Sequence, residues 1–273
     1  MKAIYNSRIL PEEEIELQIR NRAFCYGDGL FETIVTGPDR INLLSYHIAR
    51  LTDGCKVLDL QIPFSEQQLE QLLKSLETAN NLMGDIRYRI QLWRQEGGLY
   101  EPVQKQSSYL ITAAESTAPF YSKAGSLSVA QKAKLSWHAL SFAKTMSALP
   151  YVLAGLERKQ SAYDELVLTD GIGNIAECVA SNIFWVKGEK VFTPQLQSGC
   201  VKGTMREFIL SRFALAGQPI KEVMEPLASL LEADQVFISN ASGIKWVSRF
   251  EDKADFSDPG LLLKRVAILP QQP

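Results

Sequence analysis

The sequence predicts an α+β fold in two lobes, and three observations lead to this prediction. The chain has 273 residues, which suits one large domain or two small ones at about 100–200 residues per domain. Strand-like and helix-like segments are mixed without the regular strand–helix alternation of a doubly wound sheet. The composition changes at 116–125, where small and polar residues with Pro119 interrupt the pattern. We therefore expect an N-terminal α/β lobe over 1–117, an interdomain linker over 118–125 and a C-terminal lobe over 126–273.

The N-terminal half contains clear patterns of both kinds. Apolar residues recur at helical spacing from Ile48 to Leu58, which predicts a helix after Ser45. Ser65 and Gln68 form a capping-box pattern in front of a second helix rich in leucine. Alternation of apolar and polar residues predicts half-buried strands. We expect a hairpin at 3–10 and strands at 26–35, 86–92 and 108–114.

The C-terminal half is predicted to contain more strands than helices. Pro150 suits the first turn of a helix that continues through Leu156. A further helix is expected from Thr204 to a stop at Gly217. We expect strands at 126–130, 165–169, 175–186, 191–194 and 235–239, with a small-residue loop at 240–243.

Composition and charge exclude several classes of function. Hydrophobic residues make up 46% of the chain and charged residues 22%, so a sizeable core can form. The 29 basic and 31 acidic residues give a net charge of −2. This balance argues against a partner that is nucleic acid or an anionic membrane. We expect no transmembrane segment, because no apolar run reaches 18 residues.

Histidine and cysteine are too few and too scattered for a metal cluster. The chain has two histidines, His47 and His138, and four cysteines without a CxxC pair. We therefore expect no metal site and no disulfide framework. The N-terminus lacks the apolar run of a secretory signal, so we expect a cytoplasmic protein with reduced thiols.

Glu177 is the first residue that suggests chemistry. It lies in an apolar strand segment and shares a strand face with Ile175, Val179 and Ile183. A carboxylate buried there must be paired or hydrogen-bonded. It therefore either forms an ion pair between strands or accepts an N–H group of a cationic ligand.

Two glycine-containing segments could bind a phosphate. Gly199–Arg206 places Gly203 and Thr204 at a helix start, where free amide groups and the helix dipole favour an anion. The order of residues excludes a P-loop. The loop 240–243 could form a second group of amides. When each segment is taken alone, ordinary helix capping and an ordinary turn are the favoured explanations.

Lys144 and Arg50 complete a set of weak features that describe one ligand. Lys144 is the only charge in 140–149, and taken alone it is more simply a solvated lysine at a strand end. A desolvated amine at this position could instead form a Schiff base. Arg50 lies off the apolar face of its helix, as a surface residue or as an anion clamp. An aldehyde, a ring N–H and a phosphate together indicate pyridoxal 5′-phosphate.

Five segments carry a family resemblance in the same order along the chain: 26–33, 43–51, Lys144 with 149–154, 177–184 and 202–206. With these segments the sequence resembles the class IV aminotransferase superfamily, the fold-type IV pyridoxal-phosphate enzymes. The resemblance implies a D-amino-acid-aminotransferase-like fold of two α/β lobes, with the cofactor in the interdomain cleft. It also implies a homodimer and a small-molecule amino substrate.

The resemblance also implies roles for individual residues. Lys144 forms the Schiff base with the cofactor and moves protons at the substrate α-carbon. Glu177 keeps the pyridine nitrogen protonated, so that the ring accepts electrons. Asn182 supports the side of the ring that carries the hydroxyl group. The implied phosphate ligands are Arg50, the amides of Thr204 and Met205, and Ala241 or Ser242.

Within the superfamily, the segments 42–47 and 177–194 are similar to aminodeoxychorismate lyase. Such an enzyme eliminates pyruvate from 4-amino-4-deoxychorismate and gives 4-aminobenzoate, a precursor in folate biosynthesis. The lyases carry a substrate-binding arginine in a Gly-Gly-Arg-Gly-Tyr run, which reads Gly97-Gly-Leu-Tyr100 here. We therefore consider Arg94 as its substitute, with Phe31 and Tyr100 as further substrate contacts.

The main alternative is an amino-acid aminotransferase of the same class. The D-amino-acid type has an Arg-x-His carboxylate site that has no counterpart after Arg94, and a tyrosine where this chain has Phe31. The branched-chain type usually has Phe-Glu-Gly-Ile where this chain has Phe31-Glu-Thr-Ile34. A non-catalytic dimer that retains the fold is the alternative from another functional class.

Overall fold

The computed structural model describes residues 1–38 and 40–269, and the chain divides into two compact units. The first unit comprises Met1–Ala118 together with the short segment Ala143–Ser147. The second comprises Pro119–Phe142 and the chain from Ala148 onward. Each unit has its own sheet and helices, which confirms the predicted α+β fold in two lobes.

The observed boundaries differ from the predicted ones in two places. Residues 121–125 do not form a linker, because they belong to β6 (Tyr121–Val129), which pairs with strands on both sides in the second unit. Gly125 has a φ of 82° beside the Asp164 carboxylate, so glycine is needed there for a bend in the strand. Lys144 lies in the first unit and not in the C-terminal lobe.

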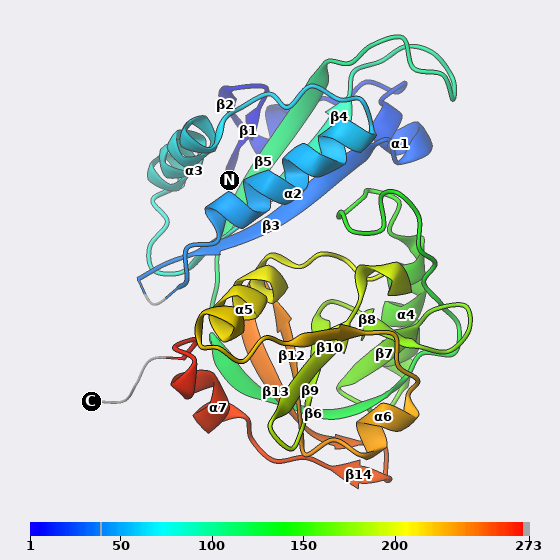
Figure 1. The fold of residues 1–273 in the computed structure, drawn as a ribbon. Coiled ribbons are helices and arrows are strands. Elements are labelled where there is room, and N and C mark those ends of the chain that lie inside the picture. Colours follow the sequence, from blue (N-terminus) through cyan, green and yellow to red (C-terminus); the bar gives the residue numbers. More distant parts are fainter. Residues whose placement is uncertain (39, 270–273) are drawn as a thin grey trace. The chain divides into compact units, whose positions relative to one another are not determined.

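The first unit is an antiparallel five-stranded sheet with two long helices (Figure 1). The strand order is β2-β1-β5-β4-β3, and α2 and α3 pack against the sheet. Its elements are β1 (Lys2–Tyr5), β2 (Arg8–Pro11), η1 (Glu12–Glu14), α1 (Arg22–Tyr26), β3 (Gly29–Thr36), α2 (Leu44–Val57), α3 (Glu66–Asn80), β4 (Ile86–Arg94) and β5 (Ser107–Glu115).

Side chains alternate along β3 and β4 between a buried face and a more exposed face of the sheet. On one face, Ile34, Tyr88 and Ile90 are almost fully buried beneath the helices. On the other face, Arg87 and Arg89 are exposed. The predicted capping box at the start of α3 is confirmed, since the Ser65 and Gln68 side chains each bond the other residue's backbone.

The second unit is a nine-stranded mixed sheet in which β6 and β13 run parallel near the middle. The path is β11-β10-β9-β12-β13-β6-β7-β8, with β14 beside β13. Its other elements are α4 (Leu149–Gln160), β7 (Glu165–Thr169), β8 (Ile175–Cys178), β9 (Asn182–Lys187), β10 (Lys190–Pro194), η2 (Leu196–Ser198), α5 (Thr204–Leu215), β11 (Lys221–Val223), α6 (Ala228–Leu231), β12 (Gln235–Asn240), β13 (Gly243–Phe250), β14 (Ala254–Asp255) and α7 (Gly260–Arg265).

The single strand predicted over 175–186 is two strands in the structure. A turn follows Cys178, where the Cys178 amide donates to the carbonyl of Ser181, and β9 starts at Asn182. The turn brings Asn182 back beside Glu177, a contact that one continuous strand could not make. No helix in the described part of the chain is long and apolar enough to cross a membrane.

Candidate active site

Lys144 is held against the first strand of the candidate site. The Phe31 amide donates to the carbonyl of Lys144 at 2.8 Å, and the Met146 amide donates to the carbonyl of Gly29 at 3.0 Å. The segment 143–147 therefore follows β3 like an additional short strand, with Leu30 opposite Thr145. This backbone pairing, which the sequence pattern does not reveal, fixes the position of the lysine relative to Phe31.

The Phe31 ring brings two cationic side chains to one place. The Lys144 Nζ atom lies 5.2 Å from the ring centroid, and the Arg89 guanidinium carbon lies 4.1 Å from it. Such distances are typical of cation–π contacts. Arg89 comes from β4, where it stands opposite Thr33 of β3. Phe31, Lys144 and Arg89 therefore lie on the face of the sheet opposite to the helices.

Glu32 points to the opposite face and binds two side chains of α2. The Arg50 Nε group donates to Glu32 Oε1 at 2.8 Å, and its Nη2 group donates to Oε2. The His47 Nδ1 atom lies 2.7 Å from Oε2. All three side chains are at most 4% exposed. Arg50 is thus a buried residue and not the surface residue that its position off the apolar face suggested, because Glu32 supplies its counter-charge.

The buried charges of Glu32 and Arg50 compensate each other. Burial alone raises the pKa of Glu32, but the charge of Arg50 and the His47 contact outweigh it and lower this pKa to about 2. The pKa of His47 is lowered, chiefly by burial, against the opposing effect of Glu32. At neutral pH the cluster therefore holds one carboxylate, one guanidinium and a neutral imidazole, so that Glu32 fixes the plane of the Arg50 guanidinium.

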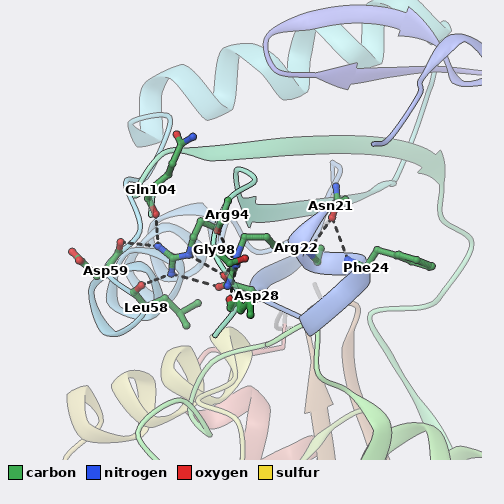
Figure 2. Close-up of polar contacts among 12 residues, drawn as sticks. Asn21, Arg22, Phe24, Asp28, Leu58, Asp59, Arg94, Gly98 and Gln104 are labelled. Atoms are coloured by element: carbon green, nitrogen blue, oxygen red, sulfur yellow. Dashed lines mark hydrogen bonds and ion pairs between the residues drawn. The ribbon is translucent and has the colours of Figure 1, made fainter. Parts of the chain in front are cut away.

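We expected Arg94 to bind substrate, but its side-chain donors form hydrogen bonds with other groups of the protein (Figure 2). Its Nε and Nη2 groups donate to the Asp28 carboxylate at 2.9 and 3.5 Å. Its remaining donors bond the carbonyls of Asp59, Gln104 and Leu58 at 3.2, 2.9 and 2.6 Å. All five N–H groups are used and the residue is 3% exposed. Arg94 is therefore a structural residue.

The Asp28 carboxylate also binds a second buried arginine, Arg22, which holds the loop at 97–99 in place. Arg22 Nε donates to Asp28 at 2.7 Å, and its Nη1 group donates to the consecutive carbonyls of residues 97–99 (Figure 2). Asn21 caps α1 by accepting the amides of residues 23 and 24. On this supported loop, Tyr100 is 91% exposed and touches the Tyr26 ring.

Glu177 lies in the second unit and is 3% exposed. Its Oε1 atom accepts the Tyr151 hydroxyl at 2.6 Å and the Val201 amide at 3.1 Å. Its Oε2 atom accepts the Asn182 side-chain amide at 3.2 Å. Three neutral donors thus stabilise the carboxylate where it is buried.

Asn182 connects Glu177 with the start of α5. The Asn182 amide also donates to the Val201 carbonyl at 2.8 Å. A Cβ atom at position 203 would overlap Asn182 Oδ1, so glycine is required for this close approach. Gly203 is the N-cap residue of α5 and has no side chain to cap the helix. The predicted anion-binding residues Thr204 and Met205 form the first turn of this twelve-residue helix and are buried.

The loop predicted at 240–243 is the tight turn between β12 and β13. Asn240 pairs with Gly243, and the Ser242 amide donates to Asn240 Oδ1 at 2.9 Å, which leaves Ala241 and Ser242 at the tip. Just before the turn, Ser239 lies opposite Asn182 and is 1% exposed. Within the described residues its hydroxyl has no hydrogen-bond partner.

The structure therefore places the predicted residues in two groups, one in each unit. Lys144, Arg50 and Phe31 belong to the first unit, whereas Glu177, Asn182, Thr204, Met205, Ala241 and Ser242 belong to the second. Sequence reasoning missed Glu32, Arg89 and Tyr151. For Arg89 the alternation of 86–92 provided the only available indication, because it places Arg87 and Arg89 on the polar face. For Tyr151 no local pattern indicates the contact.

The chain matches a protein-family model over most of its length. The model described as amino-transferase class IV matches residues 29–249. This span contains every residue that we predicted for the site.

Individual relatives have different activities. The chain is 26% identical over 247 residues to D-alanine aminotransferase of Listeria monocytogenes serotype 1/2a (strain 10403S), covering 89% of this chain and 84% of that protein. It is 28% identical over 256 residues to aminodeoxychorismate lyase of Vibrio harveyi, and the alignment covers 90% of this chain and 92% of that protein. The structure of branched-chain aminotransferase from Thermoproteus uzoniensis aligns with a TM-score of 0.84 at 24% identity, covering 97% of this chain and 92% of that one.

Substitution of Glu32 by Gln tests the buried cluster. It leaves Arg50 without its counter-charge, so we expect the free energy of unfolding at pH 7 to fall by about 3 kcal/mol. In the folded protein the pKa of Glu32 lies below its ordinary value of 4.5, so the ionised Glu32 contributes its full stabilisation above pH 4.5. The difference between wild type and variant should therefore shrink as the pH falls from 4.5 towards about 2. Denaturant titrations across this range measure both effects.

The matched control is Glu70→Gln, which removes an exposed helix ion pair with Lys74. We expect this change to cost less than about 0.5 kcal/mol at every pH. Equal stability of the two variants at pH 7 would contradict the interpretation of Glu32.

Proposed function

The chain belongs to the class IV aminotransferases, a family of pyridoxal-phosphate-dependent enzymes, and on this premise we propose that it releases pyruvate from 4-amino-4-deoxychorismate. The protein is an enzyme of this class, and its cofactor is pyridoxal 5′-phosphate. The lyase reaction would yield 4-aminobenzoate, a folate precursor. The substrate is the proposed part, since relatives with lyase and aminotransferase names are similarly distant.

The residues of the second unit fit the cofactor chemically. Glu177 is a buried carboxylate that accepts hydrogen bonds from neutral groups, and a carboxylate is the acceptor that the N–H of a pyridinium ring requires. The start of α5 has no side-chain cap at Gly203, and an uncapped helix start of this length favours a phosphate. The unpaired buried hydroxyl of Ser239 is a further polar atom that a ligand could satisfy.

We assign each unit its own part in holding the cofactor. In the second unit, Glu177 would accept the ring N–H, and Asn182 would support the ring beside it. The amides of Thr204 and Met205, with Ala241 or Ser242 from the hairpin turn, would bind the phosphate. In the first unit, Arg50 would contribute a phosphate contact whose orientation Glu32 fixes.

Lys144 would provide the covalent link to the cofactor aldehyde and then act as the acid and base. The bound cofactor supplies an electron sink that makes the substrate carbon next to the amino group acidic. Lys144 would remove the proton from that carbon and deliver a proton where the reaction requires one. The backbone pairing of 143–147 with β3 holds the amine in a fixed position for both transfers.

The observation that favours the lyase substrate is the pair Arg87 and Arg89. Residues two apart on a strand share a face, and both arginines lie on the face of Phe31. The pKa of Arg89 is lowered by partial burial and by the nearby charge of Arg87. An anion with two carboxylates would relieve this repulsion. 4-Amino-4-deoxychorismate carries a ring carboxylate and an enolpyruvyl carboxylate, whereas D-alanine or a branched-chain amino acid carries only one.

An aminotransferase of class IV is the second candidate. The same pair of arginines would suit a dicarboxylic amino donor, and relatives named as D-alanine and branched-chain aminotransferases support this reading. Such an enzyme would use the same lysine and cofactor. The two reactions differ in the fate of the amino group, which leaves with 4-aminobenzoate in the lyase and stays on the cofactor in the aminotransferase.

We further propose that the enzyme is a homodimer whose interface includes α4. Four apolar side chains of this helix are 46–73% exposed, at positions 149, 152, 153 and 156. This spacing places them on one face of the helix. Contiguous exposed apolar stripes of this kind are typical of protein–protein interfaces.

The reaction can be assigned with purified protein. With 4-amino-4-deoxychorismate, we expect pyruvate and 4-aminobenzoate in equal amounts, measured by a coupled dehydrogenase assay and by chromatography. With amino acids and no keto acid, we expect no stoichiometric conversion of the cofactor to its pyridoxamine form, monitored by absorbance. The opposite pair of results would establish the aminotransferase. Lys144→Ala is the control, and it should lose the cofactor attachment that borohydride fixes in the wild type.

Substitution of Arg89 by Met tests the carboxylate site. We expect kcat/KM for 4-amino-4-deoxychorismate to fall by about 10- to 100-fold, because a charge-assisted hydrogen bond is lost. The affinity of the apo protein for cofactor should not change. Lys105→Met, at a lysine whose side chain is 70% exposed in the same unit, is the control. Unchanged kinetics of Arg89→Met would remove this arginine from the substrate site.

The oligomeric state can be measured by light scattering. We expect twice the chain mass for the wild type and the mass of a monomer for the double variant Val152→Lys/Leu156→Lys, which charges the apolar face of α4. Ile172→Lys changes an equally apolar residue that is 89% exposed in a hairpin turn, and it should remain a dimer. A wild-type monomer, or a double variant that stays dimeric, would refute this interface.

A further inference from the structure

His47 is a buried member of the cluster that Glu32 forms with α2, and none of the roles assigned above uses it. It precedes Arg50 by three residues, so the two side chains leave the same face of the helix. Both reach Glu32 of β3, the strand against which α2 packs (Figure 1). His47 is 2% exposed, so the contact is made away from water.

The hydrogen of the contact between His47 and Glu32 belongs to the imidazole. Burial raises the pKa of Glu32, but the Arg50 charge and the His47 contact outweigh it and lower this pKa to about 2. The carboxylate is therefore ionised at neutral pH and can only accept hydrogen bonds. The His47 Nδ1 atom, 2.7 Å from Oε2, carries the hydrogen and donates it.

The two donors of Arg50 do not by themselves fix where the carboxylate lies. Arg50 binds Oε1 through Nε and Oε2 through Nη2, which aligns the planes of the guanidinium and the carboxylate. Both side chains have several rotatable bonds, so the aligned pair can still swing as one body. The imidazole rotates about fewer bonds and is enclosed between α2 and the sheet. Its hydrogen bond to Oε2 therefore fixes the direction in which the pair lies.

We propose that His47 is a positioning residue that acts through Glu32 to hold the Arg50 guanidinium in the orientation that binds the cofactor phosphate. The proposal rests on the proposed phosphate contact of Arg50 and not on the identity of the substrate. A cation that is ordered before binding holds an anion more tightly than one that must be ordered during binding. The effect of His47 should therefore be confined to ligands that carry the phosphate.

The first test replaces His47 by leucine and by asparagine and titrates each apo protein with pyridoxal 5′-phosphate. For His47→Leu we expect the Kd to rise about five- to tenfold, because Arg50 loses its fixed orientation. For His47→Asn we expect a Kd within about twofold of the wild type, because an amide N–H still donates to Glu32. The asparagine amide nitrogen is as many bonds from Cα as Nδ1 is, so its reach is similar.

Tyr88→Phe is the matched control in the same unit. The buried Tyr88 hydroxyl of β4 donates to Glu77 Oε2 of α3 at 3.0 Å, so this variant also removes a donor to a glutamate between sheet and helix. It should lower the thermal stability of the apo protein and leave the Kd for the cofactor unchanged. A Kd that rises equally in Tyr88→Phe and His47→Leu would overturn the proposal, because it would indicate general loosening of the first unit.

A second pair of measurements isolates the phosphate and the arginine. Pyridoxal has the same ring and aldehyde without the phosphate, so wild type and His47→Leu should bind it with the same Kd. Arg50→Met should raise the Kd for pyridoxal 5′-phosphate about 100-fold. In that background the further change His47→Leu should alter the Kd less than about twofold, because both residues act through one group. Thermal unfolding shows whether each apo variant is folded.

The outcomes separate this proposal from the proposed function. A wild-type Kd for His47→Leu, with weakened binding in Arg50→Met, would overturn the proposal and leave the phosphate contact intact. A wild-type Kd for Arg50→Met would overturn the phosphate contact and this proposal with it. A parallel loss of pyridoxal affinity in His47→Leu would overturn the proposal alone, and this comparison decides by itself if Arg50→Met does not fold.

Discussion

A carboxylate taken out of water must be given donors, and this constraint explains much of the structure. Asp28, Glu32 and Glu177 each sit in or beside a strand with little exposure. Asp28 is bound by two arginines and Glu32 by an arginine and a histidine, while the donors to Glu177 include the Tyr151 hydroxyl, the Val201 amide and the Asn182 side chain. In each case, donors from other elements stabilise the buried carboxylate and fix its position.

Because side chains alternate along β3, the strand presents a buried carboxylate on one face of the sheet and candidate site residues on the other. Phe31 and Glu32 are neighbours in the chain but point to opposite faces of the sheet. Glu32 faces α2 and fixes Arg50, whereas Phe31 faces away and contacts Lys144 and Arg89. One strand therefore orients both the proposed phosphate contact and the proposed reactive amine.

The sequence pattern predicted those elements correctly that depend on interactions between residues close together in the chain. The capping box of α3 and the alternation of β4 depend on neighbours within a few positions, and both were predicted from the sequence. Glu177 was recognisable because a charge in an apolar strand is unusual. Arg94 was misjudged because its acceptors include backbone carbonyls at positions 58, 59 and 104, which no pattern around the arginine itself reveals.

The sequence by itself determined the α+β class, the helices and strands with strong periodicity, and the residue types that a pyridoxal-phosphate enzyme requires. Only the tertiary structure decided that 143–147 pairs with β3 in the first unit, that Arg50 is buried on Glu32, and that Tyr151 donates to Glu177. Each of these contacts joins residues 18 to more than 100 positions apart. Periodicity and capping operate over a few residues, so contacts at such separations are set by how the strands and helices pack.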